Sequence, residues 1–404
     1  MNNSKLSMFC IIGSVSLFCM FSPLKAETDY LDKIKFKPIA KEHVDETLTL
    51  LSAAIQGNYE QIRTWQADID AYTEMVHSSS YIESVFRDII KYKGTPPQNT
   101  LSRSNRKISI MIDTQSEYVY ERSVRQGPMR YFDAKDNNEI AAVTGPFEKA
   151  YIVTPTYYID CLGNKKKDDA ITGYRAIKKP VRHQRETMMK YDIFDPRLMI
   201  YMAEPVWNYL DMWRRKLQEN NGDWKIGPHS GKFEEGRDGN DIVYHLLLPA
   251  KVTENEYVFL SLFFAEKAGW NMVKLETLMQ DLKVLGRMQA EYCVVDGIYI
   301  PKRITAYNFN EDQSVSRIED YIFAKQSLNK DIAKNTFTYE NLGLKNGDIF
   351  EDKIEGKEYK YKDAKLVEIE KKAEKNNDAE KKSEVEQKEQ ITSGDTKSTA
   401  VTGN

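Results

Sequence analysis

Residues 294–309 read VVDGIYIPKRITAYNF and contain a clear structural signal. Two runs in which apolar and polar residues alternate lie on either side of the pair Asp296-Gly297. Asp-Gly suits the positive φ angles of the tight turn between two antiparallel strands. The stretch therefore predicts a β-hairpin, in which Asp296 is a turn residue and not a catalytic or ligand-binding carboxylate.

The second strand of this hairpin has one apolar face. Successive side chains of a strand point to opposite faces, so Ile298, Ile300 and Ile304 lie on one side. Tyr299 and Arg303 lie on the other, together with Pro301. Because proline has no N–H to donate to a ladder, the sequence predicts a bulged or edge-like position at residue 301.

Similar strands continue on both sides of the hairpin, from about residue 224 to residue 327. Short turns separate them, and consecutive strands joined this tightly pair antiparallel, as a meander. On most of them one face is apolar and one is polar. The segment EYVFLSLFFAE at 256–266 is apolar on both faces, which predicts cover on both sides or a central position.

Earlier segments add more strands and the helices. Residues 64–76, 108–112, 116–124 and 149–162 predict strands, and Gly127-Pro128 predicts a turn. Residues 41–57 predict a helix that ends at Gly57, and residues 78–92 predict another. After Pro205, a stripe of apolar residues at helical spacing predicts an amphipathic helix over 205–219; it consists of Val206, Leu210, Trp213 and Leu217.

The first 26 residues have the order of a signal peptide: a lysine, an apolar run over 8–21, and a small residue at Ala26. Leu17-Phe18 is not the small-residue context of a lipid-modified Cys19, so we expect a mature chain from Glu27 that is periplasmic or secreted. An uncleaved anchor or a chance apolar N-terminus are the alternatives. No later segment has the apolar length of a membrane span.

These patterns divide the chain into residues 1–26, one domain over 27–367 with a helical insert near 193–220, and a tail. The tail, residues 368–404, is polar, mixed in charge and free of aromatic residues, which predicts disorder. The mature chain keeps Cys161 and Cys293, which either form one disulfide or remain two buried thiols.

The sequence contains no recognised catalytic motif. It has five histidines with no metal-ligand spacing, and neither a nucleophile elbow nor a phosphate-binding loop. We therefore expect no enzyme activity, no cofactor and no metal, although catalytic groups far apart in sequence would escape this search. A net charge of -3 does not favour nucleic-acid binding.

The order of these elements and one motif resemble the bacterial outer-membrane lipoprotein-sorting superfamily, the LolA/LolB-like fold, and above all its larger uncharacterised relatives. The motif is Y-x-x-V-D-G-I-x-I-P-x-R-I, followed by a strand, an asparagine and a phenylalanine. The matching residues are Tyr292, Val295, Asp296, Gly297, Ile298, Ile300, Pro301, Arg303, Ile304, Asn329 and Phe337. The resemblance implies an α+β fold: an antiparallel β half-barrel whose concave apolar face is covered by helices.

The resemblance also implies a cavity for acyl chains, as in members that carry lipoproteins across the periplasm. We therefore expect a protein that binds a lipid or an acylated protein between sheet and helices. The residues expected to line this cavity are Val273, Leu275, Met279, Met288, Tyr292, Ile298, Ile300 and Ile304, with Val206, Leu210 and Trp213 on the lid. The alternative is a structural or regulatory envelope protein with a filled core, which acts through a protein partner.

Overall fold

The structure is a computed structural model that describes residues 30–77, 99–143, 148–165, 171–181, 205–220, 225–226, 229–251, 253 and 256–370. The predicted signal peptide, the predicted helix over 78–92 and residues 193–204 of the insert lie outside these ranges. So do residues 371–404 of the predicted tail. Glu368, predicted as the first residue of the tail, is instead the last residue of a strand.

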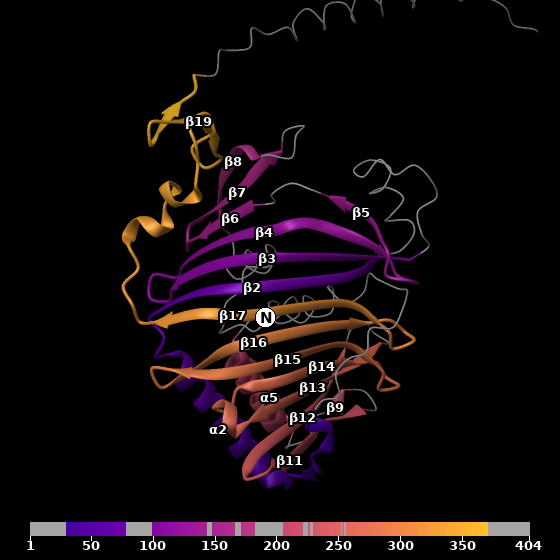
Figure 1. Cartoon of the computed structure of the whole chain (residues 1–404). Coiled ribbons are helices and arrows are strands. Elements are labelled where there is room, and N and C mark those ends of the chain that lie inside the picture. The colour runs from indigo at the N-terminus through magenta and orange to yellow at the C-terminus, as the bar shows by residue number, and fades with distance from the viewer. Residues whose placement is uncertain are drawn as a thin grey trace, which may run out of the picture.

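One 18-stranded open sheet forms the body of the described chain (Figure 1). Its strands run from β1 at one edge through β11–β17 to β2, β3, β4 and β6–β8, and end with β18–β20; β5 pairs with β4. Every pairing is antiparallel except that of β8 with β18. The predicted α+β class, with an open antiparallel sheet, is confirmed.

The first group of strands comprises β1 (Lys37–Pro38), β2 (Thr64–His77), β3 (Thr100–Asp113), β4 (Tyr118–Asp133), β5 (Glu139–Val143), β6 (Glu148–Val153), β7 (Tyr157–Lys165) and β8 (Ile171–Pro180). The second group comprises β11 (Lys232–Asp238), β12 (Asp241–Lys251), β13 (Tyr257–Ala265), β14 (Met272–Leu278), β15 (Val284–Val295), β16 (Ile298–Phe309) and β17 (Val315–Leu328). The sheet ends with β18 (Ile349–Asp352), β19 (Lys357–Lys362) and β20 (Lys365–Glu368), and a separate pair comprises β9 (Lys225–Ile226) and β10 (His229–Ser230).

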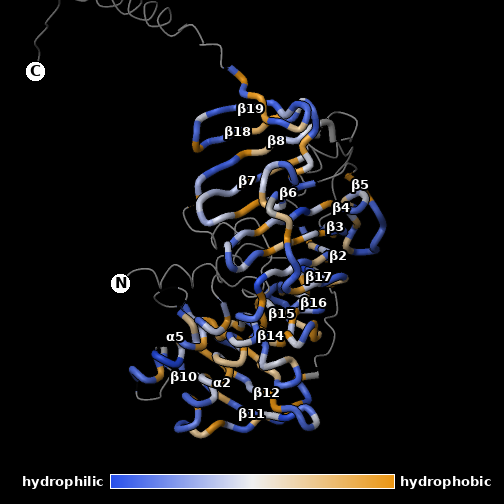
Figure 2. Tube along the Cα trace, turned by 90° about the vertical axis from the view of Figure 1, so that its left-hand side faces the viewer, coloured by the Kyte–Doolittle hydropathy of each residue, from blue (hydrophilic) through white to orange (hydrophobic). Residues whose placement is uncertain are grey.

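Two α-helices in the described chain cover one face of the sheet, which we call the inner face (Figure 2). They are α2 (Lys41–Tyr59) and α5 (Val206–Glu219), and α5 begins directly after Pro205, as predicted. α2 does not end at Gly57: the helix continues to Tyr59, and a methyl group added at Gly57 would meet no atom within 4 Å. The predicted terminator is therefore an interior helical residue.

The main core lies between α2, α5 and the inner face. It joins helix residues such as Leu48 and Leu210 to sheet residues such as Trp65, Ile110 and Ile300, all 1% exposed or less. Each of these side chains exchanges water for apolar contacts, which stabilises the fold by about 1.5–3 kcal/mol per residue. The stripe predicted for residues 206–217 is thus the face of α5 that packs against α2 and the sheet.

Two smaller clusters cover the outer face. Residues 30–38, which we call the strap, place Leu31, Ile34 and Phe36 against β12 and β13. The predicted double-sided burial of β13 is therefore confirmed. At the other end of the sheet, residues 332–350 cover β4 and β6–β8, where Cys161 is buried. Cys161 and Cys293 are both free thiols, so they form no disulfide; Cys161 is buried as expected, whereas Cys293 is only half-buried.

Hairpin β15–β16 turns at Asp296 and Gly297, with φ angles of 51° and 81°, as predicted. The register shifts next to Tyr292, which pairs with Pro301, while Glu291 pairs with Arg303. The predicted bulge at Pro301 is confirmed. Its side chain is buried, however, and not on the wet face, and Gln326 of β17 donates a 2.7 Å hydrogen bond to its carbonyl oxygen.

One predicted turn is wrong. Gly127 and Pro128 lie inside β4, although Gly127 has a positive φ of 77°, as a turn residue could. At this point β4 changes partner: residues 119–124 pair with β6, and residues 129–132 pair with β5. The glycine allows the strand to bend between two partners without ending.

Gly57→Ala is expected to raise the free energy of unfolding by about 0.5–1 kcal/mol. Alanine loses less backbone entropy than glycine in a helix interior, and the added methyl group has open space. Urea unfolding followed by circular dichroism measures the change.

Gly269→Ala is the matched control and should destabilise the protein. Gly269 has a φ of 65°, and a Cβ there would lie 2.4 Å from the ring of Tyr299. Loss of stability in the Gly57 variant would contradict the observed extent of α2.

Candidate functional site

The predicted lining residues fall into three groups. Seven lie in the main core at 4% exposure or less: Met288, Ile298, Ile300, Ile304, Val206, Leu210 and Trp213. Leu275 and Tyr292 are partly buried against the same core. Val273 and Met279 do not join it.

Val273 is the clearest correction, because it lies on the outer face with Phe263 and Leu31. The register between β13 and β14 shifts there: Phe263 pairs with Lys274, while Phe264 pairs with Met272. The shift reverses the alternation, so Met272 takes the inner position. Met279 lies beyond the end of β14, in the turn where its N–H donates to the Lys283 carbonyl oxygen.

Polar contacts hold α2 and α5 together as one unit. The Ser52 hydroxyl donates to the Asp211 carboxylate at 2.9 Å, and Arg214 donates to the Thr49 hydroxyl at 2.9 Å. Inside the pair, the ring of Tyr59 stacks on that of Trp207 with 5.9 Å between centroids. The two helices therefore present one continuous lid to the sheet.

The end of α2 is attached to the β15–β16 hairpin by a buried asparagine. Asn58 donates to the carbonyl oxygen of Tyr299 and accepts from its N–H, both at 2.8 Å. The side-chain amide thus makes the two hydrogen bonds to the Tyr299 backbone that a neighbouring strand would make. Beside it, Tyr292 donates a hydrogen bond to the Met272 carbonyl oxygen at 3.1 Å. Burial, and to a lesser extent the neighbouring Tyr59 hydroxyl, raise the pKa of Tyr292 well above its usual value.

Two open grooves lie on either side of Pro38-Ile39, where the strap meets α2 and the sheet edge. The α2 groove has a volume of about 490 Å³ and is lined by Lys37, His43, Glu46, Leu50, Glu235 and Tyr244, among others. The β10 groove has a volume of about 470 Å³; Ile39, Lys41, Val44, Lys225, Lys232, Phe233 and Glu234 line much of it. Neither groove was predicted, because its walls come from segments almost 200 residues apart.

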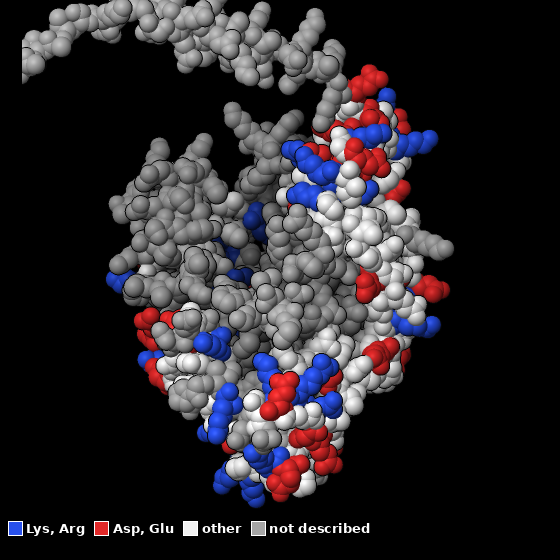
Figure 3. All heavy atoms as spheres, turned by 180° about the vertical axis from the view of Figure 1, so that it is seen from behind, with Lys and Arg blue, Asp and Glu red and all other residues white. Residues whose placement is uncertain are grey.

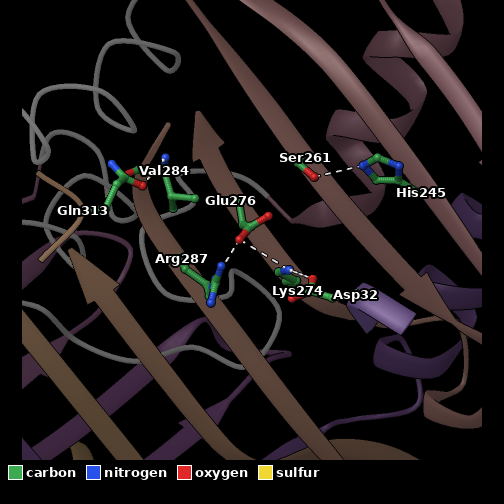
Figure 4. A network of polar contacts seen from close by, with 8 residues as sticks. All are labelled: Asp32, His245, Ser261, Lys274, Glu276, Val284, Arg287 and Gln313. Atoms are coloured by element: carbon green, nitrogen blue, oxygen red, sulfur yellow. Dashed lines mark hydrogen bonds and ion pairs between the residues drawn. The ribbon is translucent and has the colours of Figure 1, made fainter. Parts of the chain in front are cut away.

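A polar network lies on the outer face beside the strap (Figure 4). Lys274, only 2% exposed, lies 3.4 Å from both Asp32 of the strap and Glu276, and Glu276 accepts from Arg287 at 2.7 Å. His245 was predicted to make a local hydrogen bond or point to the wet face. Its ring nitrogens lie 2.8 Å from Glu234 and 2.9 Å from Ser261, which confirms the local hydrogen bonds.

Beyond β17, on β3, β4 and β6, the inner face includes charged side chains. Arg106 of β3 is directly opposite Arg125 of β4, in the same row as Ala71 of β2. Glu121 and Lys149, on the same face, are buried at 2% and 8% exposure. Figure 3 shows this side of the molecule. Glu121 and Arg125 are four residues apart in β4 and therefore share a face, and this even spacing is the only local signal for the charged half of the inner face.

The described residues contain no group of three or more side chains placed to hold a metal ion. Of the five histidines, His183 lies outside the described ranges. His77 lies 2.6 Å from the Ser102 hydroxyl, and burial lowers its pKa to about 4. Burial also lowers the pKa of His245, although Glu234 acts in the opposite direction.

Comparisons with known proteins find only distant similarity. No family model matches the chain, and no curated protein matches its sequence. The fold is similar to the crystal structure of a DUF1329 family protein from Desulfovibrio piger, with 6% identity, 74% of this chain and 98% of that chain covered, and a TM-score of 0.35.

Two further solved structures carry the name of the superfamily that the sequence resembles. One is a domain described as a candidate outer-membrane lipoprotein-sorting protein from Vibrio parahaemolyticus, with 11% identity, 75% and 99% coverage and a TM-score of 0.33. The other is a LolA superfamily protein from Nitrosomonas europaea, with 10% identity, 73% and 98% coverage and a TM-score of 0.29.

Acidification from pH 7 to pH 5 is expected to lower the free energy of unfolding by about 2 kcal/mol through His77. Its folded pKa of about 4 lies below the unfolded value of about 6.5, so the unfolded state binds the proton first. The contribution is complete above pH 6.5 and is lost as the pH falls towards 4. Urea unfolding midpoints at both pH values measure it.

His77→Gln should reduce this pH dependence. Leu101→Ala, which removes a buried side chain beside it in the sheet, should instead lower stability equally at both pH values. An unchanged pH dependence in the His77 variant would contradict the assignment.

Proposed function

We propose that the protein is an exported, non-enzymatic binding protein of the LolA-like kind, which takes up the apolar chain of a lipid or an acylated protein. The observation that supports this most is the seam between α2 and the edge of the sheet. Two grooves open there, and Ile39 and Phe233 in their walls pack directly against the main core. An apolar chain in this seam would continue the core outward.

The size of the grooves suits such a ligand. Ligand sites are commonly concave, about 300–1,000 Å³ in volume, and lined mainly by apolar side chains with a few polar groups. Both grooves fall within that range. Leu50, 42% exposed on α2, adds an apolar side chain that water now contacts.

The proposal includes export of the protein. It rests on the signal-peptide pattern of residues 1–26 and places the protein in the periplasm or outside the cell. In the described part of the chain, neither α2 nor α5 nor any shorter helix has the length and hydropathy of a membrane-spanning segment.

A second candidate function is a structural or regulatory envelope protein. Seven of the eleven residues predicted to line a cavity pack in the main core at 4% exposure or less, which favours a filled interior. Such a protein would act through its surface or its tail. Cross-linking in cells of the full chain and of a chain ending at Glu370 tests this function, which fails if both forms capture no partner.

Binding of a fluorescent fatty acid to the purified full-length chain tests the first function. Phe233→Ala should weaken binding about tenfold, because the ligand loses much of the apolar surface that the half-buried ring of Phe233 provides. Fluorescence titration measures the affinity, and native mass spectrometry of the untreated protein shows whether a lipid co-purifies.

Leu282→Ala is the matched control. Leu282 is 57% exposed in the turn between β14 and β15, so its loss should leave probe affinity unchanged. If no lipid co-purifies and the wild-type chain does not bind the probe, the proposed function is wrong.

A further inference from the structure

The two grooves lie side by side and share one wall. Pro38 and Ile39 belong to the linings of both, and the other residues of the two linings differ. The grooves are also nearly equal in volume, at about 490 and 470 Å³. A single segment of the chain therefore separates two spaces of the same size.

The shared wall, Pro38 and Ile39, is held in place by the edge of the sheet. Pro38 pairs with Glu234 of β11, and the Ile39 N–H donates a 2.8 Å hydrogen bond to the Phe233 carbonyl oxygen. The Ile39 side chain packs against the main core. Directly before the wall, Phe36 of the strap packs against the outer-face cluster of β12 and β13. Because the wall is anchored on both faces of the sheet, the grooves remain two separate spaces.

The wall offers an apolar surface to a ligand that crosses it. Pro38 is exposed and has no N–H, and the N–H of Ile39 is already bonded to Phe233. A backbone N–H that loses its water without gaining a partner destabilises a complex. Since neither residue of the wall presents such an N–H, an apolar group can lie across it without this penalty.

Each groove adds apolar side chains on its own side of the wall. Leu50 and Tyr244 line the α2 groove, and Leu50 is 42% exposed. Val44 and Phe233 line the β10 groove, where the ring of Phe233 is half-buried. Both grooves therefore have apolar surface next to the shared wall.

We propose that the ligand is an amphiphile with two apolar chains, which lies across Pro38 with one chain in each groove. This inference rests on the proposed function and adds the number of chains in one ligand molecule. Once the first chain is bound, the second binds intramolecularly. Linking two binding groups in this way raises the affinity by about 10²–10⁴-fold over that of a single group.

The test compares dioctanoylphosphatidylcholine with octanoyl lysophosphatidylcholine by isothermal titration calorimetry of the full-length chain. The two lipids have the same zwitterionic head group and the same chain length, and they differ in the second chain. Each is titrated below its critical micelle concentration. The wild-type chain should bind one molecule of the two-chain lipid, about a hundredfold more tightly than the single-chain lipid.

Two variants each fill one groove with an indole ring. His43→Trp places the ring in the α2 groove, and Ser230→Trp places it in the β10 groove. Each should lose the hundredfold preference, because only one chain of the lipid still finds a groove. Ser116→Trp, in the turn between β3 and β4, is the matched control and should keep the preference. The urea midpoints of all three variants should equal that of the wild-type chain, since every substituted residue is exposed.

Three outcomes overturn the inference. Either blocking variant keeps the preference; the wild-type chain binds the two lipids equally well; or it binds two molecules of the two-chain lipid. If the wild-type chain binds the fluorescent fatty acid but neither lipid, the inference also fails, whereas the proposed function stands. If it binds neither the fatty acid nor the lipids, the proposed function itself fails.

Discussion

The structure depends on one packing constraint: the inner face of the sheet around β12–β17 and β2 is too apolar to face water. Trp65 of β2, Leu246 of β12 and Ile300 of β16 come from distant parts of the chain, yet all are buried in a single core. α2 and α5 supply the cover. Because the two helices are joined by Ser52–Asp211 and Arg214–Thr49 contacts, they cover the sheet as a unit. The seam with its grooves exists where this cover ends.

Apolar side chains on the outer face are also covered, but by the strap and not by α2 and α5. Where strands are apolar on both sides, as in β13, the strap covers them, and Lys274 is neutralised by Asp32 and Glu276 instead of reaching water. A buried cation would otherwise carry a large desolvation cost. The contact between strap and β11 is so close that a methyl group at Gly236 would lie 2.4 Å from Ile34. The strap that closes the outer face therefore also forms the wall shared by both grooves.

The sequence predicted much of the fold from local patterns. Alternation located the strands from β12 to β17, helical spacing located α2 and α5, and Asp296-Gly297 located a hairpin turn with the positive φ angles that the turn requires. Two of its errors share one cause. At Val273 a register shift reverses the alternation, and at Pro301 a bulge accompanies burial, whereas a period of two assumes an uninterrupted ladder. Gly57 and Gly127 show that a glycine marks an end only when its surroundings also break the element.

Three features could be predicted from the sequence: which residues alternate, which helix faces are apolar and which pair turns the central hairpin. These properties depend on neighbours within a few residues. Three others follow from the folded chain: which strands lie side by side, the pairing of Arg106 with Arg125, and the groove that Lys41 shares with Lys225 and Lys232. The walls of the groove come from segments more than a hundred residues apart. They follow from the register of the sheet and from how its faces are covered, and a local pattern contains neither.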